Sequence, residues 1–191
     1  MREGDVSCVE DFIVLVDDAL PAALCDALVA EFQDSSEWNA TLVASGESNR
    51  AIRNADAISI SERAVMGRNQ RVRHQLDQGL LKACVGVVKK YHQLFPRCRI
   101  SKDSGFELLR YRPGGFYVEH TDSYQSVPRE LACSFLVNDG FTGGEFAFFG
   151  GKKVVTMRKG SALLFPANFM YPHQILPVSE GTRFSVVTWF I

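Results

Sequence analysis

The stretch from residue 106 to residue 191 constrains the fold more than any other feature of this chain, because short apolar runs alternate there with glycine-rich turns. The runs are rich in β-branched and aromatic residues, as strands are, and turns such as PGG, NDGFTGG and SEG are typical of antiparallel connections. The pattern predicts seven strands, at 106–112, 116–120, 130–137, 145–149, 153–157, 160–164 and 182–191.

The preceding part of the chain predicts one strand and two helices. Residues 12–18 form a strand-like run, and Pro21 opens a helix in which apolar residues recur every four positions. A second, longer helix is expected from Val72 to Phe95, where Pro96 ends it. Residues 35–70 are polar for much of their length and have no sustained period, so we expect a long loop region that closes on substrate.

Together these elements predict an α+β fold that is mainly β. We expect a double-stranded β-helix, or jelly-roll (cupin-like) barrel, with the N-terminal helices packed on its outside. Residues 1–191 would then form a single domain, in which 1–100 supply the supporting elements and 106–191 the barrel core.

Composition and charge narrow the class of protein. The chain is 46% hydrophobic, but no apolar run reaches the roughly 18 residues that a membrane span needs, and the N-terminus lacks the pattern of a signal peptide. We therefore predict a cytoplasmic protein without membrane contact. Residues 47–102 carry twelve Lys and Arg against four acids, whereas residues 1–46 carry one Arg against ten acids. The basic block either attracts an acidic partner or is neutralised by the acidic segment.

A His-x-Asp sequence stands in the second predicted barrel strand region. Side chains at i and i+2 of a strand project from one face, so His120 and Asp122 should point into the same space, and His173 is available as a third ligand. Two histidines and one carboxylate are the ligand set of non-haem Fe(II) oxygenases. A chance pair in a chain with four histidines is the alternative.

An arginine and a serine follow the candidate metal ligands in the sequence. Arg183 lies ten residues beyond His173, on a strand expected to return beside the metal strand, and Ser185 shares its face. A guanidinium and a hydroxyl can bind one carboxylate together. The alternatives are a surface ion pair for Arg183 and a backbone hydrogen bond for Ser185.

Several segments resemble the Fe(II)- and 2-oxoglutarate-dependent dioxygenases, in particular the catalytic domain of prolyl 4-hydroxylases. They are YRPGGFYVEHTD, LVNDGFTGGEFAF, KGSALLFP and HQILPVSEGTRFSVVTWF, and the N-terminal FIVLVDDALPAALCDALVAEF is also similar. The resemblance implies that His120, Asp122 and His173 are the catalytic iron ligands. It further implies that Arg183 and Tyr111 bind the distal carboxylate of 2-oxoglutarate, although Tyr111 could also be a packed core aromatic.

The resemblance also implies the cofactors and the reaction. Fe(II), 2-oxoglutarate and O2 would be required, ascorbate could be supportive, and hydroxylation would release succinate and CO2. In many collagen-type prolyl hydroxylases a lysine binds the cosubstrate, whereas this chain has Arg183, which weakens the case for a collagen-like substrate.

The leading hypothesis is hydroxylation of a residue in a peptide or protein, and the alternative is a free amino acid or other small metabolite. A barrel that only binds a ligand, and an oxygenase that acts on nucleic acid, are less favoured, because the catalytic set is intact and the basic block lacks interleaved aromatics. The oligomeric state is not predicted. Candidate substrate contacts are Arg50, Arg53, Tyr117, Tyr124 and Trp189, of which Tyr117 and Trp189 could equally be core residues.

Overall fold

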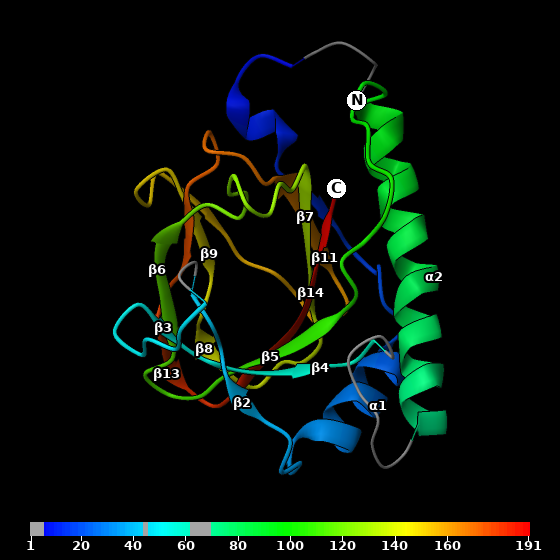
Figure 1. Ribbon diagram of the computed structural model, residues 1–191, viewed down its shortest axis with the longest axis vertical. Helices are drawn as coiled ribbons and strands as arrows, with labels where there is room; N and C mark the ends of the chain where they lie inside the picture. Colours follow the sequence, from blue (N-terminus) through cyan, green and yellow to red (C-terminus); the bar gives the residue numbers. More distant parts are fainter. Residues whose placement is uncertain (1–5, 44–45, 62–69) are drawn as a thin grey trace.

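The computed structural model describes residues 6–43, 46–61 and 70–191. Most of its strands belong to two antiparallel sheets that face each other, and two α-helices lie outside the larger sheet (Figure 1). The predicted mainly β jelly-roll with external helices is therefore confirmed. Backbone hydrogen bonds do not join the two sheets into a closed barrel.

The larger sheet has seven strands and includes the strand that carries Arg183. Its strands, in spatial order, are β1 (Val14–Val16), β11 (Ala162–Pro166), β7 (Leu131–Leu136), β14 (Arg183–Phe190), β5 (Glu107–Tyr111), β4 (Asp56–Ser59) and β2 (Asn39–Ala40).

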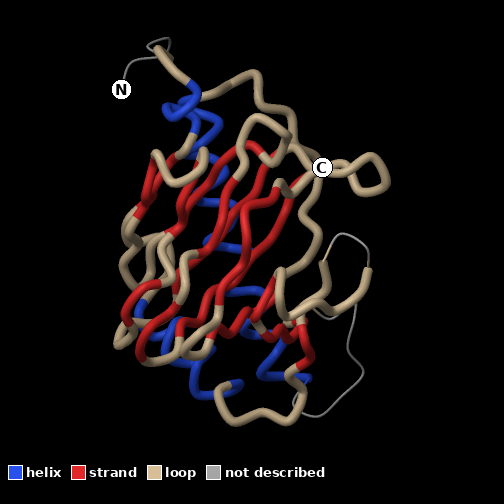
Figure 2. The backbone as a smooth tube through the Cα atoms, turned by 90° about the vertical axis from the view of Figure 1, so that its left-hand side faces the viewer, coloured by secondary structure: helices blue, strands red, loops and turns tan. Residues whose placement is uncertain are grey.

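The smaller sheet has five strands and includes both strands that carry the candidate metal histidines. Its order is β10 (Lys153–Val155), β9 (Phe146–Phe148), β12 (His173–Ile175), β6 (Phe116–His120) and β3 (Arg53–Asn54). A further two-stranded ribbon pairs β13 (Val178–Glu180) with β8 (Thr142–Gly143). In Figure 2 the strands lie side by side, with the helices behind them.

Two apolar cores lie on opposite faces of the seven-stranded sheet, because successive strand residues point to opposite sides. On β5, Leu108 packs toward the helices, whereas Leu109 and Tyr111 pack toward the five-stranded sheet. The inner core also contains Phe146, Phe148, Phe165 and Ile175. The candidate site is built on this inner face.

The helices cover the outer face of the larger sheet. Helix α1 (Ala22–Phe32) begins after Pro21, as predicted, and buries Cys25, Leu28 and Phe32. Helix α2 (Gln70–Leu94) is the long second helix, and a short 3-10 helix, η1 (Val9–Phe12), precedes β1. None of the helices in the described ranges is both long and apolar enough to cross a membrane.

The structure differs from the sequence prediction in the region 35–70. The described part of this region is not only a loop: it contains β2, β3 and β4, and β4 pairs with β5 while β3 pairs with β6. These strands have two to four residues, too few to show a period, and they are held by pairing with longer strands. Residues 44–45 and 62–69, including Arg63, lie outside the described residues.

Candidate functional site

His120 and His173 lie directly opposite each other on two neighbouring strands. His120 is the last residue of β6, His173 is the first residue of β12, and the two are partners in the antiparallel register. Their ring centroids are 4.3 Å apart. The sequence prediction did not include β12, but the strand brings the third candidate ligand to the first.

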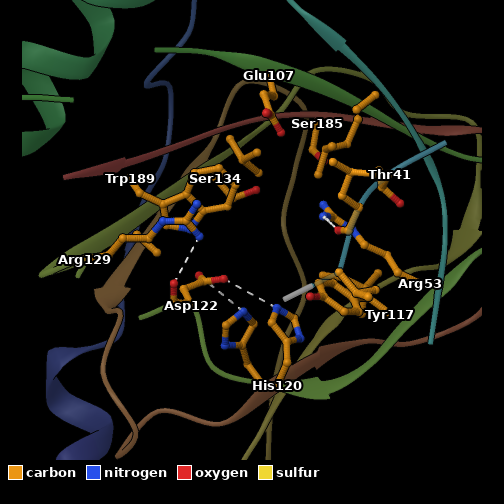
Figure 3. A pocket seen from close by; sticks show the side chains of 18 of the residues that line it. Thr41, Arg53, Glu107, Tyr117, His120, Asp122, Arg129, Ser134, Ser185 and Trp189 are labelled. Carbon is orange, nitrogen blue, oxygen red and sulfur yellow. Dashed lines mark hydrogen bonds and ion pairs between the residues drawn. The ribbon is translucent and has the colours of Figure 1, made fainter. Parts of the chain in front are cut away.

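Asp122 completes the cluster from a bend two residues beyond the end of β6, rather than from the strand itself. Its Oδ1 lies 3.5 Å from Nε2 of His120, and its Oδ2 lies 3.6 Å from Nε2 of His173. One possible ligand atom from each residue lies within 4.8 Å of the others. The three side chains could therefore hold one metal ion (Figure 3).

Backbone carbonyls orient both imidazoles. Nδ1 of His120 lies 2.9 Å from the Val118 carbonyl oxygen, and Nδ1 of His173 lies 3.1 Å from that of Tyr171. Because a carbonyl oxygen can only accept a hydrogen bond, Nδ1 carries a proton in each ring, and Nε2 is the atom through which the neutral ring would bind a metal ion. The Nε2 atoms of both rings lie beside Asp122, where they could bind one metal ion.

Burial and neighbouring charges set the protonation states of the cluster. Burial lowers the pKa of His173 to about 4, although Asp122 opposes this shift. Burial alone would raise the pKa of Asp122, but His173, together with hydrogen bonds from the side chains of His120 and Trp189, holds it below its usual range. At neutral pH the cluster therefore offers a neutral imidazole at His173 and an ionised carboxylate, the forms that bind metals.

Arg183 approaches the same cavity from the opposite sheet. Its strand, β14, pairs with β5 and β7, so it does not lie beside the metal strand as predicted but faces it across the inner core. Arg183 is 2% exposed, and its Nη1 donates a 2.8 Å hydrogen bond to the hydroxyl of Ser185. Tyr111 is its direct partner on β5, with the guanidinium carbon 5.4 Å from the tyrosine ring centroid.

No carboxylate of the described residues forms an ion pair with Arg183. Burial lowers the pKa of this guanidinium, while Tyr111 and Glu145 raise it, and an arginine stays protonated under all ordinary conditions. A buried charge without a counter-ion is unfavourable, so the geometry favours an anionic ligand at this position.

A glycine lets Arg183 take this position. Gly144 has a φ of +73°, and a Cβ atom there would lie 2.7 Å from Cδ of Arg183. Any larger residue would displace the arginine. Gly143 also has a positive φ, a conformation that glycine adopts without strain.

Arg129, which the sequence analysis did not single out, lies between Asp122 and Trp189. The guanidinium carbon of Arg129 lies 3.8 Å from the ring centroid of Trp189, and its Nη1 donates a 3.1 Å hydrogen bond to the Asp122 carbonyl oxygen. Arg129 stands in a short polar loop without a motif, so no signal in the sequence marks it.

These side chains line one cavity of about 470 Å³. Of the predicted substrate contacts, four line it, whereas Arg50 lies outside, where it pairs with Asp56 at 2.5 Å. The ring of Tyr117 stacks on that of His120, with centroids 3.5 Å apart. Glu107, Ser134 and Thr41 also line the cavity (Figure 3) and were not predicted. The predicted residues brought together here are His120, Asp122, His173, Tyr111, Arg183, Ser185, Arg53, Tyr117, Tyr124 and Trp189.

Residues 106–191 match the family described as the 2OG-Fe(II) oxygenase superfamily. The matched residues make up the β-rich part of the chain. The match confirms the family resemblance drawn from the sequence, and with it the oxygenase class and the cofactors Fe(II), 2-oxoglutarate and O2. The role of ascorbate stays a prediction.

Curated relatives and solved structures agree with this superfamily. A PKHD-type hydroxylase of Maricaulis maris is 31% identical over 88 residues, which cover 43% of this chain and 39% of that protein. The chain thus matches about two fifths of the length of that relative. A PKHD-type hydroxylase of a Synechococcus strain is 22% identical over 96% of this chain and 77% of its own length.

One similar solved structure is a prolyl hydroxylase from Trichoplax adhaerens, in complex with a peptide fragment of the hypoxia inducible factor oxygen degradation domain. It is 16% identical, covers 94% of this chain and 83% of its own, and has a TM-score of 0.77. At this level of identity the likeness concerns the fold alone, which this chain shares.

Proposed function

We propose that this 2OG-Fe(II) oxygenase hydroxylates a prolyl residue of a peptide or protein. The observation that carries the proposal is a single cavity in which a buried His-Asp-His cluster faces a buried arginine that has no acidic partner among the described residues. The cluster suits a metal ion and the arginine suits a carboxylate, and an oxygenase of this kind must hold both in one place.

His120, Asp122 and His173 would hold Fe(II). Two neutral imidazoles and one carboxylate occupy three positions of an octahedral ion and leave three for other ligands. When bound, Fe(II) supplies, with 2-oxoglutarate and O2, the oxidising power that adds a hydroxyl group to the substrate while succinate and CO2 are released. The Val118 and Tyr171 carbonyls keep the two rings in the tautomer that can bind it.

Arg183, Ser185 and Tyr111 would bind the distal carboxylate of 2-oxoglutarate. The guanidinium supplies the charge, and the Ser185 hydroxyl, which accepts a hydrogen bond from Arg183, can donate its own proton to the ligand. Because the three side chains come from adjacent strands of one sheet, the distal carboxylate would lie across the cavity from the metal cluster.

Aromatic side chains keep water away from the metal cluster. Around His173, the ring centroids of Phe165, Phe148 and Phe146 lie at 4.7, 5.6 and 6.0 Å. Excluding water strengthens the electrostatic interactions inside the site and protects reactive species from side reactions.

The names of the relatives support a prolyl substrate. They are PKHD-type hydroxylases, and the prolyl hydroxylase with the similar fold was solved with a peptide bound. The residues that line the cavity, Tyr124 and Trp189 among them, come from separate segments of the chain, which suits an extended ligand. Hydroxylation of a free amino acid is the second candidate, because the metal cluster and Arg183 would serve both substrates.

The proposal can be tested with the purified chain, Fe(II) and 2-oxoglutarate. Proline-containing peptides should stimulate succinate formation, and mass spectrometry should find one added oxygen atom on the proline. If neither peptides nor free proline stimulate turnover, and no peptide gains oxygen, the proposed substrate class is wrong.

A first variant addresses the metal. His173→Ala should lose most metal affinity because two remaining ligands hold an ion far more weakly than three. Calorimetric titration with Mn(II), a redox-stable substitute, measures this loss. His74→Ala, which changes a histidine of α2, serves as the control and should bind like the wild type. Equal affinity in His173→Ala would refute its role as a ligand.

A second variant addresses the cosubstrate. Arg183→Ala should raise the KM for 2-oxoglutarate about tenfold to a hundredfold, since a charge-assisted hydrogen bond contributes about 1.5–3 kcal/mol. Metal affinity should stay nearly unchanged. Tyr111→Phe removes one hydroxyl and should raise the same KM less. If the KM does not change in Arg183→Ala, a different cation binds 2-oxoglutarate.

A further inference from the structure

Arg53 is a second buried arginine in the catalytic cavity. It is 9% exposed, lines the cavity with the metal cluster, and lies beside Tyr117 in Figure 3. Its Nε is shielded from solvent and has no hydrogen-bond partner. Among the described residues, this N–H donor of Arg53 therefore has no acceptor.

Strand pairing holds Arg53 in this position. It lies on β3 directly opposite Tyr117 on β6, and its guanidinium carbon is 4.6 Å from the tyrosine ring centroid. Its Nη1 donates a 3.2 Å hydrogen bond to the Leu42 carbonyl oxygen. Since the Tyr117 ring stacks on the ring of His120, the charge of Arg53 is separated from the metal cluster by one aromatic layer.

The two other buried arginines each have an acidic partner. Arg73 pairs with Glu37 at 2.5 Å, and Arg110 pairs with Asp56 at 2.9 Å. Within the described ranges, Arg53 and Arg183 are the buried arginines without an ion pair, and both line the same cavity. A buried cation that lacks a counter-ion is costly, so both positions favour an anionic ligand.

Two anions in this cavity do not neutralise Arg53. The carboxylate of Asp122 lies beside His120 and His173 rather than beside Arg53. Glu107 lines the cavity but does not form an ion pair with Arg53. The cosubstrate does not supply a third carboxylate: one of its two is assigned to Arg183, and the other, next to the keto group, belongs at the metal. The anion that pairs with Arg53 must therefore come with the substrate.

We infer that Arg53 binds a carboxylate of the substrate and selects for acidic substrates. The inference rests on the proposed function and adds the chemical class of the substrate. The carboxylate can be the α-carboxylate of a proline, free or at a peptide C-terminus, or the side chain of an acidic neighbour. Ser134, whose buried Oγ also lacks a partner, lines the cavity on the side of Trp189 (Figure 3) and offers a polar contact to the same occupant.

Binding can be measured without turnover, in calorimetric titrations of protein loaded with Mn(II) and 2-oxoglutarate. The probes form matched pairs: acetyl-Gly-Pro acid against acetyl-Gly-Pro amide, and acetyl-Gly-Pro-Glu amide against acetyl-Gly-Pro-Gln amide. Free L-proline is a fifth probe. The variants are Arg53→Gln, Arg53→Lys and the control Arg50→Gln, which changes an exposed arginine of the same segment that lies outside the cavity.

In the wild type, at least one acidic probe should bind about tenfold or more tightly than its neutral partner, as a charge-assisted contact would give. The pair that shows the preference identifies the source of the carboxylate. Arg53→Gln should abolish the preference, Arg53→Lys should retain part of it because the charge remains, and Arg50→Gln should behave like the wild type. The affinity for 2-oxoglutarate, titrated alone, should be the same in all four proteins.

Three results would overturn the inference. If the wild type binds neutral probes as tightly as acidic ones, the cavity has no carboxylate site. If Arg53→Gln still binds acidic probes more tightly than neutral ones, a different residue forms that site. Weaker 2-oxoglutarate binding in Arg53→Gln would assign Arg53 to the cosubstrate. Failure of the proposed function has a different signature, because the Fe(II)-loaded wild type would then add oxygen to none of the proline-containing probes, whether or not it binds the acidic ones more tightly.

Discussion

At the scale of single residues, the site depends on charges that the fold buries in defined protonation states. His173 is kept neutral because burial penalises its charged form more than Asp122 favours it. Asp122 stays ionised, although it is buried, because His173 and His120 stabilise its charge. The same environment that prepares these groups for a metal ion makes the metal-free protein sensitive to pH.

Lowering the pH from about 6.5 to about 4 should destabilise the metal-free protein. The pKa of His173 is about 4 in the folded protein against 6.5 for an ordinary histidine. Between these values the unfolded chain takes up a proton that the folded chain does not. The stability associated with neutral His173 is therefore fully present above pH 6.5 and is lost as the pH falls toward 4, by up to about 3 kcal/mol.

Urea unfolding at several pH values measures this loss, and His173→Gln provides the comparison. Without a titrating imidazole at this position, the free energy of unfolding should depend less on pH in the same window. An equal pH dependence in wild type and variant would show that other groups account for the effect.

At the scale of elements, short connections place the charged residues of the site. Gly144 directly follows β8, and the ribbon of β8 and β13 covers the side chain of Arg183. The close approach of 2.7 Å that a Cβ atom would make is possible only because glycine has none. This contact links a turn residue to the affinity for the cosubstrate.

Gly144→Ala should therefore weaken 2-oxoglutarate binding as well as stability. Gly150→Ala is the matched control, because Gly150 also has a positive φ, +67°, but open space around it. Both variants should lose about 1 kcal/mol or more of unfolding free energy from backbone strain. Only Gly144→Ala should also raise the KM for 2-oxoglutarate. A normal KM would mean that Arg183 moves aside without loss of function.

The sequence predicted the elements whose residues repeat a period over several positions. The two helices and the apolar strands such as β5, β7 and β14 were found in this way. The strands β2, β3, β4 and β12 have two to four residues, and their existence depends on partners distant in the chain. Because Arg53 lies on one of these strands, its burial and its missing partner could not be predicted.

At the scale of the whole molecule, the seven-stranded sheet separates two cores with different roles. The outer core joins the sheet to the helices and includes Leu80 of α2, whereas the inner core surrounds the metal cluster and includes Phe148. Both side chains are fully buried. Stability depends on both cores, but the geometry of the site depends directly on the inner one alone.

Substitutions in the two cores should therefore separate stability from metal binding. Leu80→Ala should cost about 2–5 kcal/mol of unfolding free energy, and Phe148→Ala about 3–5 kcal/mol, from lost burial and the cavity that remains. Leu81→Ala, at a position 37% exposed, is the control and should cost much less.

At a temperature where all variants are folded, Leu80→Ala should keep the wild-type Mn(II) affinity. Phe148→Ala should lose affinity, because its ring lies 5.6 Å from that of His173 and helps to hold it. Equal metal affinity in both variants would show that strand pairing alone positions the histidines.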